Sequence, residues 1–250
     1  MKNKTLWKQV GAAAIAAAMV MSTVPATPVQ AAGGKTLAVS SQKQLNQALK
    51  TVKGKNAVIT VKAGKNVKIT IPKGTYKVTI RVVGKKAAVV NNGTVKEIVV
   101  NSKGTVAIKN NGTIKKVTVQ NAKSVSFSGN HKKAVPVVVN AEDVSMILAA
   151  PAKITAKKDV NIVLKKGAEK SSITCTKNAQ AQVDNQTKKA ISVKIADGTT
   201  LKVESGESCT ITPKGKKEDT SGEDKTDGKD QKTDDTSDGN ASSGSSSSGN

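Results

Sequence analysis

Aromatic side chains are almost absent from this chain. Its 250 residues contain one Trp, one Tyr and one Phe, and Trp7 belongs to an N-terminal leader. An antiparallel β-sandwich of this length normally fills its core with several large side chains, so the composition argues against that fold. It also argues against nucleic acid as a partner, because single strands are usually held by stacking on aromatic rings.

The groups that enzymes use for acid–base chemistry are also few. The chain has one histidine, His131, in a polar turn, and one arginine, Arg81, and we interpret both as solvent-facing. Glycoside hydrolysis needs two carboxyl groups that flank the bond. The only adjacent acids between residues 32 and 213 are Glu142 and Asp143, and neighbours on a strand point to opposite faces. No catalytic residue, cofactor or metal ligand is therefore predicted.

The two cysteines, Cys175 and Cys209, lie in separate short runs of strand-forming residues. Together with a single histidine they cannot build a zinc site. In an exported protein the two thiols are candidates for one disulfide bond. The sequence does not fix the distance and orientation that this bond requires, so bonded and unbonded states both stay open.

The two ends of the chain differ in composition from the region between them. Lys2, Lys4 and Lys8 precede an Ala-rich apolar run, and small residues follow around Ala31. This order predicts a signal peptide at residues 1–31, so we expect a secreted protein with no transmembrane segment after cleavage. Residues 214–250 are Lys, Asp, Glu, Thr, Ser and Gly with almost no aliphatic residue, which predicts a disordered tail. Residues 32–213 are expected to form the folded domain.

Positive charge is concentrated in this domain. The chain has 41 basic and 18 acidic residues. The leader contains 3 basic residues and the tail contains 6 basic and 9 acidic ones, which leaves 32 basic and 9 acidic residues in 32–213. Such an excess favours polyanionic partners through long-range, salt-dependent attraction. The other interpretation is that the lysines provide solubility and protect exposed strand edges.

A repeat in the middle of the domain predicts its architecture. Asn91-Asn92-Gly93 recurs nineteen residues later as Asn110-Asn111-Gly112, and each copy leads into a short apolar strand. A third, weaker copy begins at Gly74. A period near twenty with two short strands per period is typical of stacked coils. We therefore predict an all-β fold, a single-stranded parallel β-helix (β-solenoid) with 19–20 residues per coil.

Both ends of the predicted solenoid have a candidate cap. Ser40 or Ser41 begins a short amphipathic helix with apolar residues at Leu45, Ala48, Leu49 and Val52. At the other end, residues 191–203 alternate in polarity around Asp197-Gly198, which predicts a β-hairpin. We expect the helix and the hairpin to cover the open edges of the stack.

Stacking of the repeat would form two ladders of side chains. Asn91 would lie over Asn110 and Asn92 over Asn111, where their amides can hydrogen-bond. Lys77, Lys96 and Lys115 occupy one position of the three copies, and stacked coils would place successive lysines about 4.8 Å apart. We hypothesise that this stripe binds a polyanion; the alternative is a solvated face with no ligand.

The upstream copy is out of phase with the other two. Val78 and Ile80 lie twenty residues before Ile98 and Val100, not nineteen. A slip of one residue would turn each strand inside out. The sequence therefore predicts a corner after Lys77 that is one residue tighter than the corners of the later copies.

The helix, the strand Ala57–Val61 and the turn Ile71-Pro72-Lys73-Gly74-Thr75-Tyr76 resemble the start of pectin-lyase-like right-handed parallel β-helices. In that superfamily a short helix caps the N-terminal end, and a Pro-x-Gly-Thr-Tyr turn often enters an early coil. The chain is also similar to Lys-rich secreted solenoid domains of unassigned role from Gram-positive anaerobes. The resemblance covers Thr36 to about Val203; it implies the fold and says little about activity.

These observations favour a non-catalytic structural or binding module that is exported and associated with the cell wall. Its expected partners are anionic polysaccharide or teichoic acid. The alternative is a polysaccharide lyase or hydrolase of the β-helix type, which would need several acids that converge on one groove.

Overall fold

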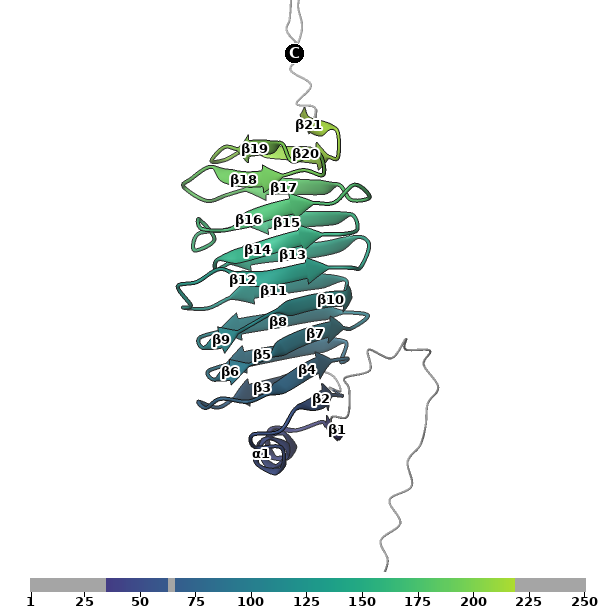
Figure 1. The fold of residues 1–250 in the computed structure, drawn as a ribbon, viewed down its shortest axis with the longest axis vertical. Helices are drawn as coiled ribbons and strands as arrows, with labels where there is room; N and C mark the ends of the chain where they lie inside the picture. Colours follow the sequence, from purple (N-terminus) through teal and green to yellow (C-terminus); the bar gives the residue numbers. More distant parts are fainter. Residues whose placement is uncertain (1–34, 63–65, 219–250) are drawn as a thin grey trace, which may run out of the picture.

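The computed structural model describes residues 35–62 and 66–218, which form a stack of about eight β-coils with one helix at its lower end (Figure 1). The predicted signal peptide and most of the predicted tail lie outside the described residues. The all-β parallel solenoid expected from the repeat is therefore the fold of the described chain.

Each coil contributes one strand to each of two long sheets. The ten-stranded sheet has the order β1 (Lys35–Val39), β2 (Ala57–Val61), β4 (Val78–Val82), β7 (Glu97–Asn101), β10 (Val117–Asn121), β12 (Val135–Val139), β14 (Ala152–Ala156), β16 (Ser172–Cys175), β18 (Ile191–Lys194) and β19 (Thr200–Val203). The nine-stranded sheet has the order β21 (Gly215–Glu218), β20 (Ser208–Thr212), β17 (Ala181–Asn185), β15 (Val160–Leu164), β13 (Val144–Ala149), β11 (Ser124–Ser128), β8 (Thr105–Asn110), β5 (Lys86–Asn91) and β3 (Val67–Ile71). A third, two-stranded sheet pairs β6 (Thr94–Val95) with β9 (Thr113–Ile114).

The core lies between the two long sheets and is almost entirely aliphatic. Strands such as β2 and β4 alternate between buried and half-buried residues, as the period of two in a strand requires. Stacking then places like residues over one another, for example Ile80 beside Ile98 and Ile98 beside Val117. Phe127 is the one large aromatic side chain buried among the described residues. The narrow interior thus explains why the sequence has so few aromatic residues.

The predicted helix cap is present as α1 (Gln42–Thr51). The Ser41 side chain accepts a hydrogen bond from the amide of Gln44, which stabilises the helix start, and Leu45, Ala48 and Leu49 are buried. The Gln42 side chain donates to the Thr70 carbonyl oxygen (2.8 Å) and accepts from the Thr70 amide (2.6 Å). Gln42 thereby satisfies backbone groups of β3, the first strand of its sheet, in the way a neighbouring strand would.

The predicted hairpin is also present, and a second one accompanies it. β18 pairs antiparallel with β19 through the turn at Asp197 and Gly198. β18 is itself the last parallel strand of the ten-stranded sheet, rather than a strand laid over the final coil. β20 pairs antiparallel with β17, and β21 with β20, so the nine-stranded sheet has its own cap. β21 extends the described fold to residue 218, into the stretch assigned to the tail.

The register expected at the upstream repeat copy is wrong. Ile80 pairs with Ile98, eighteen residues later, although the bridge between Thr75 and Thr94 keeps the offset of nineteen. The corner after Lys77 is therefore one residue longer than its counterparts, not one residue tighter. Val78, Ile80 and Val82 are all aliphatic and all face inwards. Pairing of Val78 or of Ile80 with Ile98 would therefore bury aliphatic residues equally well, and the sequence alone does not choose between these two registers.

Coil length also varies along the stack. Val117 lies beside Ile98 at the expected nineteen residues, whereas Ala152 lies beside Val135 at seventeen and Val160 beside Val144 at sixteen. The shortening comes from a two-residue corner, 150–151, between β13 and β14. The corners on either side, 129–134 and 165–171, have six and seven residues. The expected 19–20 residues per coil hold near the repeat but not here.

Candidate functional site

The corners that lead from the nine-stranded sheet to the ten-stranded sheet form one side of the stack, on the left in Figure 1, where β6 and β9 lie. We call this side the basic edge. Its exposed lysines are Lys73, Lys77, Lys96, Lys115, Lys116, Lys132, Lys133, Lys165, Lys166, Lys170, Lys188 and Lys189. The same corners contain one carboxylate, Glu169, and hydrogen bonds from the Gly167 amide lower the pKa of that group. A second carboxylate, Glu97 at the start of β7, borders the edge and pairs with Lys116 (3.5 Å). The edge is therefore strongly positive along the length of the stack.

Two of the three lysines of the predicted stripe are aligned. Thr94 pairs with Thr113 and Val95 with Ile114, which brings Lys96 and Lys115 to equivalent positions on adjacent coils. Lys77 is not in this register, because the Lys96 amide donates to the carbonyl oxygen of Val78 (3.0 Å). All three side chains are exposed, and none has a carboxylate within ion-pair distance in the part of the chain that the structure describes.

The asparagines of the repeat contact one another across the coils. The buried Asn91 side chain donates to the Asn110 side-chain oxygen (2.8 Å), and Asn111 donates to the Asn92 side-chain oxygen (3.0 Å). Asn91 also donates to the carbonyl oxygen of Gly93 (2.9 Å). These contacts between side-chain amides, and from Asn91 to the corner backbone, hold the corners of adjacent coils together.

The glycines of the repeat permit the close approach that this stacking needs. A Cβ atom on Gly112 would lie 2.1 Å from the Gly93 carbonyl oxygen, and one on Gly93 would lie 2.5 Å from that of Pro72. On the next coil Gly129 takes the place of Asn110, so the asparagine ladder ends there. A Cβ atom on Gly129 would lie 1.9 Å from the Asn110 carbonyl oxygen. The side-chain nitrogen of Asn110 is buried and has no acceptor among the described residues.

The short corner at 150–151 leaves a hollow in the basic edge, which we call the notch. Its volume is about 560 Å³, and its walls come from the corners 129–134, 165–171 and 186–190. The notch is lined by charged or ionisable groups at His131, Lys132, Glu169, Lys170, Lys188 and Lys189. Lysines of three separate corners thus border the same space.

His131 is fixed in place, which contradicts its interpretation as a solvent-facing loop residue. Its Nδ1 lies 3.2 Å from the carbonyl oxygen of Asn110, and its Nε2 lies 3.0 Å from that of Pro151. The ring meets Phe127 edge-on, with ring centres 5.2 Å apart. Sequence reasoning missed this role because the short corner that brings Pro151 within reach was not foreseen.

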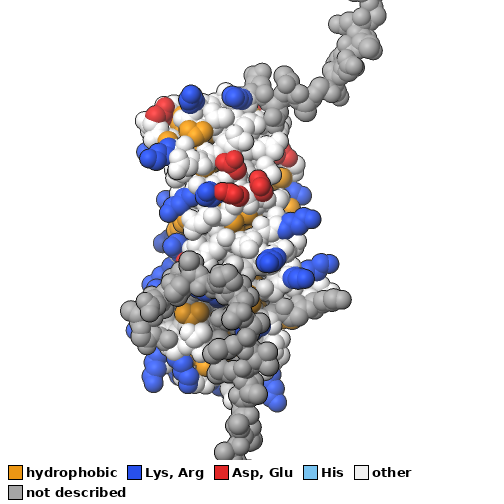
Figure 2. All heavy atoms as spheres, turned by 90° about the vertical axis from the view of Figure 1, so that its right-hand side faces the viewer, with side chains coloured by type: hydrophobic (Ala, Val, Ile, Leu, Met, Phe, Trp, Pro, Cys, Tyr) orange, Lys and Arg blue, Asp and Glu red, His pale blue; other side chains and the backbone are white. Residues whose placement is uncertain are grey.

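The opposite edge carries charge of both signs. Glu142, Asp143 and Asp159 line one hollow of about 180 Å³ together with Lys158, and Figure 2 shows acidic side chains gathered on this side. The local coil of sixteen residues, rather than nineteen, brings Asp143 and Asp159 together. A lysine in this group, Lys158, bonds to Glu142 (2.8 Å) and lowers the pKa of that carboxyl.

The acidic hollow thus meets one condition for an enzyme, several acids at one place, but lacks another. A general acid needs a raised pKa, and that of Glu142 is shifted the other way. Within residues 35–62 and 66–218, no three His, Cys, Asp or Glu side chains are grouped so that they could hold a metal ion.

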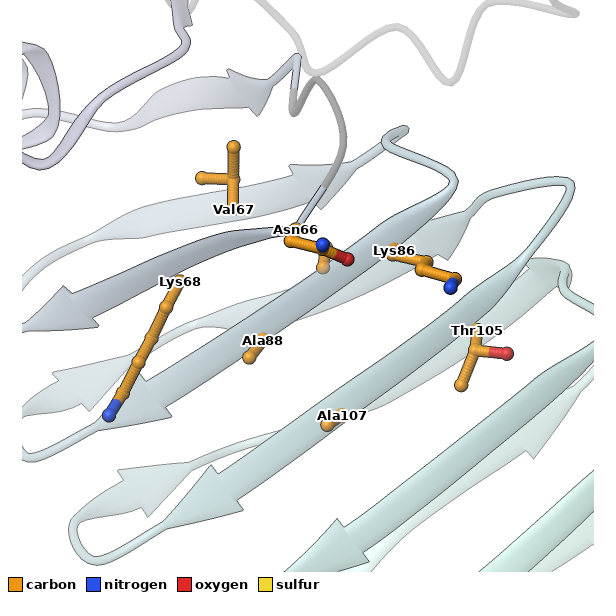
Figure 3. A pocket seen from close by; sticks show the side chains of 8 residues that line it. Asn66, Val67, Lys68, Lys86, Ala88, Thr105 and Ala107 are labelled. Carbon is orange, nitrogen blue, oxygen red and sulfur yellow. The ribbon is translucent and has the colours of Figure 1, made fainter.

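A further hollow, of about 360 Å³, lies on the outer face of the nine-stranded sheet (Figure 3). Ala88 and Ala107, which are neighbours on β5 and β8, form its floor, and Lys68, Lys86 and Thr105 stand around them. The residues that line it include no carboxylate. The floor of this hollow consists of small side chains, and the hollow lacks a pair of carboxyl groups for acid–base chemistry.

The two cysteines are not bonded to each other. Cys175 lies on β16 in the ten-stranded sheet and Cys209 on β20, which caps the nine-stranded sheet. Both thiols are buried, and burial raises the pKa of Cys175 to about 11.

Comparison of the chain with protein-family models, with curated proteins and with solved structures gives no match. The structure supports the β-solenoid architecture, and the resemblance to pectin-lyase-like proteins stays a prediction from the sequence. No helix within the described ranges is long and apolar enough to cross a membrane.

Proposed function

We propose that this protein is a non-catalytic binding module that holds an anionic polymer along its basic edge. The observation that carries this proposal is the row of exposed lysines on stacked corners. Of the two carboxylates beside them, Glu169 accepts from the Gly167 amide and Glu97 pairs with Lys116. A linear array of positive charge matches a linear array of negative charge, as in an acidic polysaccharide or a teichoic acid.

Electrostatics favours an occupied edge. Strand spacing in a sheet places equivalent corner residues about 4.8 Å apart, and like charges at such distances repel one another. The cost is modest at an exposed position, because the high dielectric constant of water reduces the repulsion between two charges at such a distance to about 1 kcal/mol. A bound polyanion would replace this repulsion by attraction, so binding is expected to weaken steeply as salt is added.

The predicted signal peptide supports the choice of polymer. An exported, strongly basic domain meets cell-wall and extracellular glycans before it meets nucleic acid. The described surface also lacks the aromatic platforms on which bases or neutral sugars stack, because Phe127 is buried and Tyr76 is half-buried.

The test is binding of the full chain to immobilised poly(glycerol phosphate) and to polygalacturonate at near-physiological salt. The variant K77Q/K96Q/K115Q removes three charges from the basic edge. The control variant K85Q/K103Q/K123Q removes three exposed charges from the opposite edge of the same coils. We expect the first variant to lose binding at least several-fold more than the control. Equal losses would show that net charge, and not the basic edge, determines binding.

A second candidate function rests on the acidic hollow. Glu142, Asp143 and Asp159 at one place are the group that a polysaccharide hydrolase or lyase would require. Incubation with polygalacturonate, with detection of new reducing ends and of unsaturated products, tests this candidate. Product formed by the wild type but not by E142Q/D159N would favour an enzyme, and the absence of product from both would exclude cleavage of that polymer.

A further inference from the structure

We infer that the notch is a binding subsite for a compact oxyanion carried by a sugar-sized unit, such as a phosphate or a uronic carboxylate. This inference rests on the proposed function, because it names the part of the polymer that one place on the basic edge would recognise. The notch volume of about 560 Å³ lies within the range of about 300–1,000 Å³ that small-molecule sites occupy.

Contacts within the described chain fix the walls of the notch. His131 is held between the carbonyl oxygens of Asn110 and Pro151 and packs against Phe127. Gly167, with φ of 104°, lies so close to the Ala149 carbonyl oxygen that a Cβ there would be 2.5 Å from it. A ligand would therefore enter a preformed space and would order only the ends of the lysines.

The charges around the notch select an anion. Lys132, Lys170, Lys188 and Lys189 border it and supply only hydrogen-bond donors. The His131 ring faces two carbonyl oxygens, which accept but cannot donate. The ring can therefore only act as a donor towards them, and these contacts hold it in the wall of the notch.

Glu169 makes the site suitable for a sugar unit. Its two carboxylate oxygens accept from the Gly167 amide at 3.1 and 3.0 Å, which fixes the group at the border of the notch. Each carboxylate oxygen can accept more than one hydrogen bond. A ligand with anionic oxygens for the lysines and hydroxyl donors for Glu169 would satisfy both kinds of group, whereas a bare inorganic ion would not.

Recognition by lysine alone also limits the specificity that we expect. Arg81, the one arginine of the chain, is on β4 and does not line the notch. Without a guanidinium fork the site has no bidentate preference for planar carboxylates. Several ammonium groups around one space instead favour the group with the higher charge, which is phosphate over carboxylate.

The test uses the single histidine as a reporter. The chain has one His, so the ring Cε1–H signal of His131 in a ¹H–¹³C spectrum is unique. The full chain is titrated at one neutral pH with glycerol 3-phosphate, with galacturonate and with glucose. We expect a saturable shift of this signal with the two anions, tighter for glycerol 3-phosphate, and none with glucose. A tighter response to galacturonate would keep the site and name the carboxylate as its ligand.

Two matched variants separate the notch from general charge. K170Q/K188Q/K189Q is expected to weaken the glycerol 3-phosphate response about tenfold or more, while K85Q/K103Q/K123Q, with the same charge removed from the opposite edge of the stack, leaves it nearly unchanged. A single sharp His131 signal before titration, well separated from that of the urea-unfolded chain, verifies that each variant is folded. K188Q alone replaces the notch variant if that variant is not folded. Non-saturable shifts, a response to glucose, or equal losses in both variants would overturn the inference.

The outcomes also separate this inference from the proposed function. Saturable binding of glycerol 3-phosphate without retention on either polymer would keep the notch and remove the polymer-binding edge. Retention on the polymer that depends on Lys77, Lys96 and Lys115, without a saturable His131 response, would keep the edge and remove the notch.

Discussion

Asn91 stabilises its corner from the inside. Its side-chain nitrogen donates to the Asn110 side-chain oxygen and to the Gly93 carbonyl oxygen, and its own side-chain oxygen accepts from the Gly93 amide. The residue is fully buried. Removal of a buried partner leaves polar groups without hydrogen bonds, which costs more than the bond itself contributes.

The first prediction concerns this residue. Asn91→Ala should lower the free energy of unfolding by about 1–3 kcal/mol, because the buried Gly93 amide loses its side-chain acceptor and the Asn110 side-chain oxygen loses a donor. Asn111→Ala removes the equivalent contact at an exposed position and is the control. Urea unfolding of both variants measures the difference. A loss for Asn111→Ala as large as that for Asn91→Ala would contradict the structural role assigned to Asn91.

The second prediction concerns the thiol of Cys175. Burial raises the pKa of this group from 9.0 to about 11. The folded state therefore binds more protons than the unfolded state in this window, so its contribution to stability falls as the pH rises from about 9 towards 11. The decrease should be smaller in Cys175→Ala, as urea unfolding at several alkaline pH values would show. In the native wild type, a thiol reagent such as Ellman's reagent should react with Cys175 only after denaturant is added. Rapid reaction of Cys175 without denaturant would contradict its burial.

At the scale of elements, the ends of the stack are closed by different means. α1 covers β3 and supplies Gln42 to the backbone of Thr70, while the C-terminal end uses antiparallel strands on both sheets. A parallel sheet edge presents unpaired backbone groups that can recruit another chain. The caps therefore keep the stack from growing by edge-to-edge association.

The third prediction follows from the C-terminal caps. A chain that ends after Lys194 would lack β19, β20 and β21 and would expose the edges of β17 and β18. We expect it to form dimers or larger assemblies, detected by size-exclusion chromatography with light scattering. A chain that ends after Glu218 keeps all three strands and should elute in the same oligomeric state as the full chain. Identical states for both truncations would contradict the capping role.

The elements also show which parts of the fold the sequence could predict. Each copy of Asn-Asn-Gly contains the residues that form its corner. The coils around Asn91 and Asn110 were therefore predictable from the spacing of the copies alone. In the run Val78–Val82 every second residue is aliphatic. A shift of two residues therefore buries aliphatic side chains equally well, and the pairing of this strand was predicted wrongly. The shortened coil at Ala150 and Pro151 has no repeat signal, and the notch that depends on it was not predictable.

At the scale of the whole molecule, stacking of the coils gives the solenoid two edges that differ in charge. Corners of one kind line up on the basic edge, and corners of the other kind line up opposite, where acids occur as well. The excess of lysine was visible in the composition, but its distribution between two edges was not. That distribution depends on which strand each corner follows, which only the pairing of the sheets reveals.

The central claim is that the basic edge binds an anionic polymer, and the salt dependence of polymer binding tests it most directly. The dissociation constant of the full chain for poly(glycerol phosphate) is measured from low to high NaCl, together with K77Q/K96Q/K115Q and K85Q/K103Q/K123Q. If three lysines of the edge contact the polymer, the logarithmic slope for the first variant should fall by about two relative to the wild type, because fewer counterions are released. The control should keep the wild-type slope. Equal slopes for the wild type and both variants would contradict the claim.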